Sequence, residues 1–524
     1  MQGYFALVLH AHLPFVRHPE HEKFLEENWL FEAITETYIP LIQVMDGWLR
    51  DGMETRLTLS LSPTLCSMLR DPLLQDRYQR HLDSLIELAE KEIHRTHWDR
   101  AYHELAWMYH HHFTTIRNTY SAYGRDVVGA FRKFQEQGKI EIITCAATHA
   151  LLPLLANHAP SLRAQILVAR DHYQSCFGCE PSGIWLPECA YVEGVETVLQ
   201  EANIRWFVTD THGILYARPR PRYGVFAPVY TPNGIAAFGR DLDSAKQVWS
   251  KQEGYPGDVR YRDFYRDIGF DLDFDYVKPH LPAPDQRGFT GIKYHRITGG
   301  AGEKQVYDRG AALQMAAEHA GHFLGARMGQ IQQLAGIMDR PPLVLSPYDA
   351  ELFGHWWYEG PQFLDYFVRK THYDQQVFSL ITPREYLRLH PTQQVATPSA
   401  SSWGAEGYWN VWLNETNEWI YPHLHIAQER MSELARRFPR ADGLRQRALN
   451  QAARELMLAQ ASDWPFILRT GTSPDYARKR VKDHLLRFIA LHEQLTTTRI
   501  NAKLLSRIES ADNLFPDLNY RYWA

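Results

Sequence analysis

The sequence contains few cysteines and no long apolar run. None of its apolar stretches approaches the ~18 residues that a membrane-spanning helix needs, although the chain has 524 residues. Its first ten residues lack a basic region and are too short for a signal peptide, so we expect a first strand there. Five cysteines, an odd number, favour a reducing compartment over a disulfide-bonded secreted protein. We therefore expect a cytoplasmic protein without a membrane partner.

The sequence also lacks a basic block. It contains 56 Lys and Arg against 61 Asp and Glu, giving a formal net charge of −5, which argues against nucleic acid as a partner. A chain of this length is too long for one ordinary core, so two or three domains are expected. Aromatic residues are plentiful, with 15 Trp. Flat rings of this kind either fill cores or bind the apolar faces of sugars.

The first two thirds of the chain alternate short apolar runs with longer amphipathic segments. This alternation predicts βαβ units with parallel strands. The predicted strands are 4–9, 56–61, 140–145, 183–186, 206–209, 235–238 and 343–346. The predicted helices are 31–49, 74–92, 127–137, 162–175, 195–202 and 306–338. Seven strands over this length favour an incomplete (β/α)7 barrel over a small doubly wound sheet.

Two parts of the sequence interrupt or follow this rhythm. Residues 95–126 are polar and aromatic and predict a helical insertion. From residue 404 onward the pattern is helical only, which predicts an all-α C-terminal domain over 404–524. The predicted helices there are 415–438, 443–466, 474–497 and 502–513, and Pro465 interrupts the second of them. We thus expect a catalytic barrel over 1–94 and 127–403, with the C-terminal domain contributing to its cleft.

Polar side chains follow several of the predicted strands. They are His10 and His12 after the first strand, His149 after the third, Glu188 after the fourth and Asp349 after the seventh. In (β/α) barrels the active site lies at the carboxyl ends of the strands. These residues are therefore expected to meet in one site.

Glu188 and Asp349 each stand in a Pro-containing, aromatic context after a buried run. Two carboxyl groups placed in this way suit glycosidic bond chemistry, in which one protonates the leaving oxygen and the other meets the oxocarbenium-like carbon. The alternative is that each carboxylate only caps a helix. Apolar neighbours favour a raised pKa for Glu188 and hence the acid role, but Glu351 beside Asp349 favours the opposite assignment. The residues alone leave the two roles undecided.

His10 and His12, two positions apart, could face a metal ion or hydrogen-bond sugar hydroxyls. A metal needs a third ligand, which His149 or Asp349 could supply. The His run at 110–112 cannot face one ion from a helix, and the Cys pair at 176 and 179 lacks further ligands nearby. We expect polar, site-lining histidines and no metal or organic cofactor.

Three further segments bear on the site. Residues 403–412, WGAEGYWNVW, are glycine-rich and aromatic, which favours a sugar-stacking surface over a core stripe. Arg240 follows another strand and either orients a carboxylate or forms a surface pair. The turn-rich, aromatic segment 213–236 is predicted to cover the site.

On these residues the chain resembles glycoside hydrolase family 57, over nearly its whole length. Five family regions occur in order: HAHLP at 10–14, TCAATHALLP at 144–153, GIWLPECAY at 183–191, SPYDAELFGHWW at 346–357 and WGAEGYWNVWLNETNEW at 403–419. The third and fourth are highly specific. The resemblance implies the incomplete (β/α)7 barrel, the helical insertion, the helical C-terminal domain and a retaining mechanism.

The resemblance also implies residue roles. Glu188 would be the nucleophile and Asp349 the general acid/base. The run from 248 to 267 is similar to that of the α-1,4-glucan branching enzymes of the family. The residues expected to bind substrate are His10, His12, His149, Tyr230, Arg240, Arg262, His355, Trp403, Trp412 and Asp463. Tyr230 would lie over the site, and Trp403, Trp412 and Asp463 would line the donor side.

The resulting hypothesis is a 1,4-alpha-glucan branching enzyme acting on amylose, amylopectin or glycogen as a monomer or small homo-oligomer. Within the family, an α-amylase or a 4-α-glucanotransferase is the alternative. A metal-dependent carbohydrate deacetylase or mannosidase using His10 and His12 is a second enzyme class. A glucan-binding protein with an inactive site is a third reading, which the presence of both carboxylates disfavours.

Overall fold

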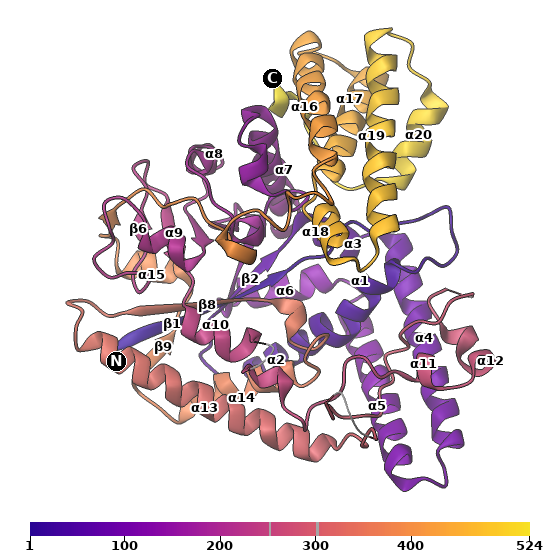
Figure 1. The fold of residues 1–524 in the computed structure, drawn as a ribbon, viewed down its shortest axis with the longest axis vertical. Helices are drawn as coiled ribbons and strands as arrows, with labels where there is room; N and C mark the ends of the chain where they lie inside the picture. Colours follow the sequence, from indigo (N-terminus) through magenta and orange to yellow (C-terminus); the bar gives the residue numbers. More distant parts are fainter. Residues whose placement is uncertain (251–252, 284, 300–302) are drawn as a thin grey trace.

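The computed structural model describes residues 1–250, 253–283, 285–299 and 303–524. Its centre is a curled sheet of parallel strands in the order β8–β1–β2–β3–β4–β5–β7 (Figure 1). These strands are β1 (Gly3–Ala11), β2 (Leu57–Leu61), β3 (Ile140–Cys145), β4 (Gly183–Trp185), β5 (Trp206–Thr209), β7 (Ala236–Gly239) and β8 (Leu343–Asp349). All seven predicted strands are confirmed, and so is the incomplete barrel.

The barrel stays open between its two end strands, β7 and β8. Beyond the end of β7, the Asp241 amide donates to the Leu345 carbonyl at 2.9 Å, and the Ser346 and Ser244 hydroxyls hydrogen-bond at 2.6 Å. These contacts bring the two edges together without a strand ladder. Short strands extend the sheet: β6 (Val229–Tyr230), β9 (Phe378–Leu380) and β10 (Gln394–Val395).

Alternating strand residues fill the barrel interior, and helices cover its outside. Apolar side chains of the strands form an interior cluster of Val8, Ile143, Trp185, Trp206, Phe238 and Leu345, among others. The covering helices are α1 (Glu27–Ala33), a π-helix (Ile34–Tyr38), α2 (Ile39–Arg50), α6 (Val127–Glu136), α7 (Ala159–Phe177), α8 (Val195–Glu201), α13 (Arg309–Ala335) and α14 (Gly360–Tyr373). Each covering helix is apolar on one face and buries that face against the sheet.

The insertion is a helical hairpin. Helix α5 (Arg100–Ala122) lies along α4 (Pro72–Arg95), with contacts from His103 to the Ile93 carbonyl and from Arg117 to Asp83. The pair projects from the barrel at the lower right of Figure 1. Helix α4, which the sequence pattern assigns to the barrel, packs along this insertion helix.

The C-terminal helices form the upper part of the molecule in Figure 1. They are α16 (Ile420–Arg437), α17 (Gly443–Ala459), α18 (Asp463–Thr470), α19 (Pro474–Thr496) and α20 (Ala502–Ala511). The predicted interruption at Pro465 is confirmed, because α17 ends before it and α18 is a separate helix. In the parts of the chain that the structure describes, we find no helix with the length and apolarity needed to cross a membrane.

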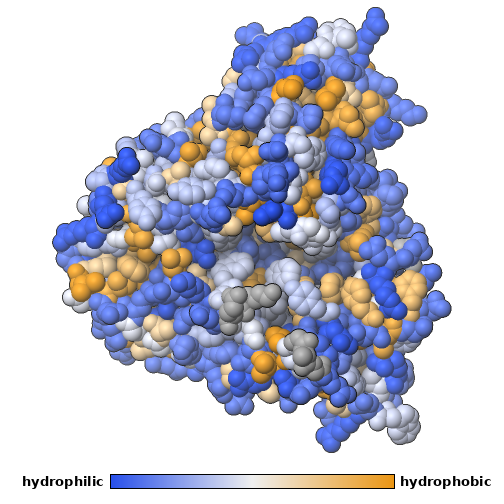
Figure 2. Space-filling view, viewed as in Figure 1, coloured by the Kyte–Doolittle hydropathy of each residue, from blue (hydrophilic) through white to orange (hydrophobic). Residues whose placement is uncertain are grey.

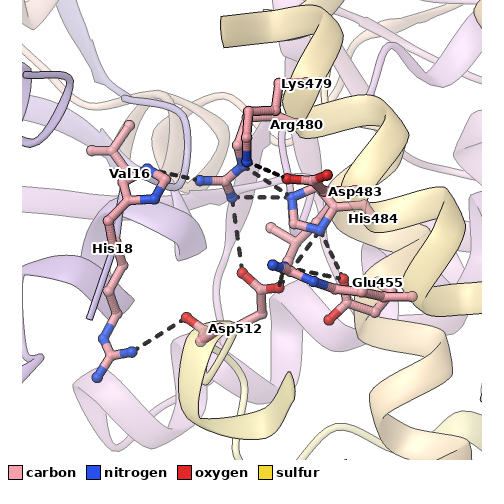
Figure 3. A network of polar contacts seen from close by, with 12 residues as sticks. Val16, His18, Glu455, Lys479, Arg480, Asp483, His484 and Asp512 are labelled. Atoms are coloured by element: carbon pink, nitrogen blue, oxygen red, sulfur yellow. Dashed lines mark hydrogen bonds and ion pairs between the residues drawn. The ribbon is translucent and has the colours of Figure 1, made fainter. Parts of the chain in front are cut away.

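A buried ionic network joins these helices to the barrel (Figure 3). Arg480 of α19 contacts His18, which follows β1, at 3.3 Å and donates to His484 Nε2 at 3.0 Å. His484 Nδ1 lies 2.8 Å from Glu455 of α17. Since a guanidinium only donates, His484 Nε2 is the acceptor and its Nδ1 carries the proton. Asp512, paired with Arg487, completes the network.

Candidate active site

The carboxyl ends of the strands carry the polar residues that the sequence placed there. Parallel register pairs His10 of β1 with Ser60 of β2 on one side and with Asp349 of β8 on the other. Glu188 lies in the short 3-10 turn Pro187–Cys189 that follows β4. Figure 2 is drawn in the same view as Figure 1. It shows a hollow in the molecular surface between the C-terminal helices above and the barrel helices below.

Three histidines line the site and are held by serine hydroxyls. His10 Nδ1 contacts Ser60 Oγ at 3.0 Å, and His12 Nδ1 contacts Ser62 Oγ at 2.8 Å. The Nε2 atoms of His10 and His149 are 3.0 Å apart, and the rings of His12 and His149 stack at 3.8 Å. Burial lowers the pKa of His10 and of His149 well below the usual value. Both rings are therefore neutral and act as hydrogen-bonding groups.

The C-terminal region supplies two residues of the site. Asp463, the first residue of α18, contacts His12 Nε2 at 3.0 and 3.2 Å. Ser462, the residue before it, contacts His149 Nδ1 at 2.8 Å. Two neighbouring residues of the helical domain thus fix two histidines of the barrel.

Glu188 is held in an unusual backbone conformation. Its φ is 62°, in the left-handed region that a non-glycine residue rarely adopts, and that of Cys189 is 51°. Strain of this kind persists where the surroundings impose it, and it gathers at functional sites. The indole of Trp403 donates to Glu188 Oε2 at 2.6 Å, and the Trp403 amide donates to the Glu188 carbonyl at 3.0 Å. The Glu188 side chain is 17% exposed.

Asp349 is the last residue of β8, and its surroundings disfavour a negative charge. Burial raises its pKa well above the usual range, and the neighbouring carboxylates of Glu351 and Glu188 raise it further, whereas Arg240 lowers it. Glu351 is fixed beside it, because its Oε1 accepts from the His12 amide at 3.1 Å and from the Tyr38 hydroxyl. The structure thus places a second carboxylate against Asp349, as the sequence suggested.

The two carboxyl groups differ in how well they hold a negative charge. Burial raises the pKa of Glu188 to about 7, and the Asp463 carboxylate acts in the same direction, whereas the Trp403 hydrogen bond and the His12 ring lower it. Asp349 faces two carboxylates and is opposed only by Arg240. These environments favour an ionised Glu188 and a protonated Asp349. They support the roles that the family resemblance implies for the two residues.

Arg240 and two tryptophans form one wall of the site. Arg240 pairs with Asp210, which follows β5, at 3.1 Å and lies over the Trp403 ring at 5.7 Å. The ring of Trp249, at the end of α10 (Leu242–Trp249), lies edge-on to Trp403 at 6.1 Å and is 37% exposed. Residues 251 and 252 of the run noted in the sequence lie outside the described residues.

Arg262 and His355 belong to a separate cluster. Both contact Glu36 of the π-helix, Arg262 at 3.2 Å and His355 at 2.6 Å. Arg262 is 4% exposed and lies over the Tyr358 ring at 3.8 Å. Its buried guanidinium is thus committed to protein contacts, so its predicted contact with substrate is not supported. His355 lies in the segment that follows Asp349, and its ring also contacts Glu36.

Trp412 and Tyr230 also depart from their predicted places. Trp412 is 1% exposed and packs behind Gly404, so its ring is not open to a ligand. Tyr230 lies in β6, opposite Ala236 at the amino-terminal start of β7, whereas the site lies at the carboxyl ends of the strands. Tyr230 therefore does not lie over the site in this structure, contrary to the prediction. In segment 403–412 the open aromatic ring is that of Tyr408, which is 46% exposed.

Several site residues were missed from the sequence. Ser60 and Ser62 show the same i, i+2 spacing after their strand as His10 and His12, and parallel register between the first two strands would have paired them. Asp210 could have been found as the polar residue after the fifth strand. Trp249 and Ser462 carried no local signal.

Some of these side chains resemble metal ligands in their grouping. Among the residues that the structure describes, three groups of His, Cys, Asp or Glu have ligand atoms within 4.8 Å of one another: His10, Cys145 and His149; His12, His149 and Asp463; and Glu455, His484 and Asp512. In the first two groups, Ser60, Ser62 and Ser462 engage Nδ1 of every histidine. In the third, arginines already neutralise the carboxylates.

Comparison with known proteins agrees with this geometry. Residues 6–399 match the family described as glycosyl hydrolase family 57, and residues 423–523 match a region described as 1,4-alpha-glucan branching enzyme, C-terminal. A 1,4-alpha-glucan branching enzyme of Thermococcus kodakarensis is 32% identical, over 98% of this chain and 78% of its own length.

Two solved structures are also similar. An alpha-amylase of Thermotoga maritima shares 44% identity with a TM-score of 0.94, covering 100% of this chain and 99% of its own. A branching enzyme of this family from Pyrococcus horikoshii shares 31% identity with a TM-score of 0.90, covering 100% and 97%. The family match and both structures span the barrel with its carboxyl pair, and this chain belongs to glycoside hydrolase family 57.

Proposed function

We propose that this enzyme is a 1,4-alpha-glucan branching enzyme, which cleaves an α-1,4-glucan and transfers the segment to a 6-hydroxyl to form an α-1,6 branch. The observation that carries the proposal is the C-terminal match at 423–523 to the branching-enzyme region. That region is part of the site, since Asp463 contacts His12 at 3.0 Å. The Thermococcus kodakarensis relative supports the same activity.

The proposed mechanism assigns one step to each carboxyl group. Ionised Glu188 attacks the anomeric carbon while protonated Asp349 donates its proton to the leaving oxygen, which yields a covalent glucosyl–enzyme. Asp349, now a base, takes the proton of an incoming 6-hydroxyl as that oxygen attacks the anomeric carbon and displaces Glu188. The two inversions retain the α configuration. The neutral histidines and Arg240 are placed to hydrogen-bond sugar hydroxyls.

Branching requires that a glucan hydroxyl, and not water, reach the intermediate. Binding and orienting the acceptor raises its effective concentration, and closing the site excludes water. Because Tyr230 lies at the other end of β7, we propose that Trp249 and Tyr408 shield the intermediate instead. Both rings are partly exposed: that of Trp249 lies edge-on to Trp403, which holds Glu188, and that of Tyr408 lies 5.8 Å from the His212 ring.

We also propose a division of the chain into three regions. Residues 1–94 and 127–403 would form the catalytic barrel, 95–126 the helical insertion and 404–524 the C-terminal domain that completes the cleft. The contacts of Asp463 and Ser462 with the barrel histidines support a shared cleft. All five cysteines are unpaired, which supports our proposal that the enzyme works in the cytoplasm on glycogen-type glucans.

An α-amylase is the second candidate, favoured by the 44% identity to the Thermotoga maritima alpha-amylase. Incubation with amylose, followed by counts of α-1,6 linkages and of new reducing ends, separates the two activities. Branching predicts more α-1,6 linkages than reducing ends. Reducing ends without α-1,6 linkages would establish hydrolysis. A metal-dependent deacetylase or mannosidase would instead lose activity in EDTA, to which the proposed mechanism is insensitive.

Trp403→Phe tests how the ionised form of Glu188 is stabilised. The variant keeps an aromatic ring but removes the 2.6 Å donor to Oε2. A hydrogen bond to a charged group is worth about 1.5–3 kcal/mol, so the pKa of Glu188 should rise by roughly one to two units. Because Glu188 must be ionised to react, the acid limb of the pH profile should move to higher pH by the same amount.

The measurement is kcat/KM on amylose as a function of pH. Trp107→Phe, a substitution of a half-exposed tryptophan on α5, is the matched control and should leave the profile unchanged. An acid limb that stays in place in Trp403→Phe would contradict the assigned role of this hydrogen bond.

A further inference from the structure

The carboxylate of Asp210, the residue after β5, links two basic side chains of the site. Asp210 occupies the N-cap position of α9 (Thr211–Leu215), but within the described residues of that helix its side chain caps no backbone amide. Its Oδ1 instead lies 3.2 Å from His212 Nδ1, and its Oδ2 accepts from Arg240 Nη1 at 3.1 Å. The Asp210 side chain is 9% exposed. A buried carboxylate at a strand end is thus used to hold two side chains and not to start a helix.

His212 carries this link to the segment that contains Trp403. Its Nε2 lies 2.9 Å from the carbonyl oxygen of Gly407, 195 positions further along the chain. Because a carbonyl oxygen only accepts, this nitrogen carries the hydrogen and donates. The Asp210 carboxylate at the other ring nitrogen fixes the orientation of the imidazole. The ring therefore joins the end of β5 to a distant turn by one directed hydrogen bond.

The carbonyl of Gly407 closes the turn that presents Trp403. It also accepts from the Ser402 amide at 2.8 Å, and the Gly407 amide donates to the Gly404 carbonyl at 2.9 Å. Gly407 has a φ of 79°, and a Cβ at this position would lie 2.9 Å from His212 Nε2. Glycine thus permits both the left-handed backbone and the close approach of the ring. Trp403 lies inside this turn, so a hydrogen bond at the end of the turn restrains its backbone.

The same turn carries two side chains with roles in the proposed reaction. The Trp403 indole donates to Glu188 Oε2 at 2.6 Å, and Arg240, the second side chain held by the carboxylate, lies over the Trp403 ring at 5.7 Å. The ring of Tyr408 lies edge-on to the His212 ring at 5.8 Å. The donor to the nucleophile and one proposed shield of the intermediate are therefore held from the same point.

We propose that His212 is a positioning residue, which acts by holding the turn that ends at Gly407. It keeps the Trp403 indole on Glu188, so that the nucleophile is ionised when it attacks. It also keeps the Tyr408 ring in place, so that a glucan hydroxyl and not water reaches the intermediate. Both effects rest on the proposed mechanism, and the second rests in addition on the proposed branching activity.

Two substitutions that differ in reach test the hydrogen bond itself. His212→Gln places an amide nitrogen near the position of Nε2 and can still donate to Gly407, whereas His212→Asn is one methylene shorter and cannot. The measurement is kcat/KM for fluoride release from a maltosyl fluoride as a function of pH, which reports attack by Glu188 without any need for branching. His423→Asn, which replaces an exposed histidine of α16, is the matched control.

In His212→Asn, the acid limb should move to higher pH by about half a unit to one unit. This is part of the shift expected for Trp403→Phe, since a loosened indole keeps some of its hydrogen bond. His212→Gln and the control should keep the wild-type limb. The charged and titratable groups that face Glu188 are the same in all these variants, so a shift reports the indole; they are His12, His149, Asp349 and Asp463.

The second readout is the ratio of α-1,6 linkages to new reducing ends formed on amylose. His212→Asn should lower this ratio by roughly two- to tenfold, the change that the loss of one hydrogen bond produces in a ratio of rates. His212→Gln should restore most of it. In a double variant with Trp403→Phe, His212→Asn should move the acid limb no further, because its effect on Glu188 passes through the indole.

The outcomes separate the proposal from its alternatives. An acid limb that stays in place in His212→Asn, with folding verified by circular dichroism, would overturn the link to Trp403. Equal shifts in His212→Asn and His212→Gln would show that the size of the ring matters and not its hydrogen bond. A further shift in the double variant would assign His212 another route of action.

Two further results keep the test decisive. If His212→Asn does not fold, Asp210→Asn replaces it, because the loss of the charge loosens the ring while the side chain keeps its size. A smaller shift in the same direction is expected there, and an unchanged limb would overturn the proposal. A wild-type enzyme that forms reducing ends without α-1,6 linkages would refute branching, whereas fluoride release would still report the role of His212.

Discussion

Glu188→Gln is expected to lower turnover on amylose by roughly 10⁴-fold or more, with the fold intact. The amide cannot form the glucosyl–enzyme bond, and removal of a covalent nucleophile costs rates of this order. The side-chain oxygen can still accept from the Trp403 indole, so the local structure should be kept. Purified variant and wild type should be compared in reducing ends and α-1,6 linkages formed, with circular dichroism to verify folding.

The matched control is Glu406→Gln. Glu406 also has a left-handed φ, of 64°, but it is exposed and contacts Asn410. Its substitution should leave turnover unchanged. A further arm uses Glu188→Ala with azide, which can occupy the vacated space and attack the anomeric carbon once. The product should then be a glycosyl azide of inverted configuration. Full activity in Glu188→Gln, or a retained azide product, would contradict the nucleophile assignment.

Asp349→Asn is expected to lower turnover on amylose by about 10²–10⁴-fold, the usual contribution of general acid–base catalysis. The loss should depend on the leaving group, because Asp349 donates a proton only where one is needed. On a maltosyl fluoride, whose fluoride leaves without protonation, glucosyl–enzyme formation should be nearly unaffected. Rates on the two substrates, measured on the same preparation, provide the comparison. An equal loss on both would show that Asp349 has another role.

The same variant should change the pH dependence. In the wild type, kcat/KM should fall on the acid side as Glu188, whose pKa is about 7, becomes protonated. It should fall on the alkaline side as Asp349, whose pKa burial and two neighbouring carboxylates raise well above its usual value, loses its proton. Asp349→Asn removes the group that gives the alkaline limb, so only the acid limb should remain. An alkaline limb that persists in the variant would assign it to another group.

Much of the fold could be predicted because it depends on local patterns. Short apolar runs bounded by turns predicted all seven barrel strands, and parallel strands place their carboxyl ends together. That rule brought His10, His149, Glu188 and Asp349 to one end of the barrel. Pro465 predicted the break between α17 and α18 for an equally local reason, its missing amide hydrogen.

The contacts that the sequence did not reveal join distant segments. Trp403 donates to Glu188 across 215 positions, and Asp463 contacts His12 across 451. No periodicity carries information over such separations. The aromatic character of residues 403–412 indicated a ligand surface, but only packing decided that Trp403 faces the site and that Trp412 is buried behind Gly404.

Two predicted site residues lie elsewhere for the same reason. Arg262 belongs to a family-like run, yet its guanidinium pairs with Glu36 and lies over the Tyr358 ring. The prediction that Tyr230 lies over the site was based on its position in a turn-rich segment. Antiparallel pairing with Ala236 carries it to the opposite end of β7, a result of strand register that composition cannot predict.

The sequence by itself determined that this protein has a parallel barrel with two carboxyl groups at the ends of its strands, because apolar periodicity and chain order are local properties. It left open which carboxyl group holds the proton. Only the tertiary structure shows the surroundings of each group: the Trp403 donor, the His12 ring and the Asp463 carboxylate near Glu188, and two carboxylates and Arg240 near Asp349. A pKa depends on the charges and donors within a few ångströms in space, and most of these come from parts of the chain that are far apart in sequence.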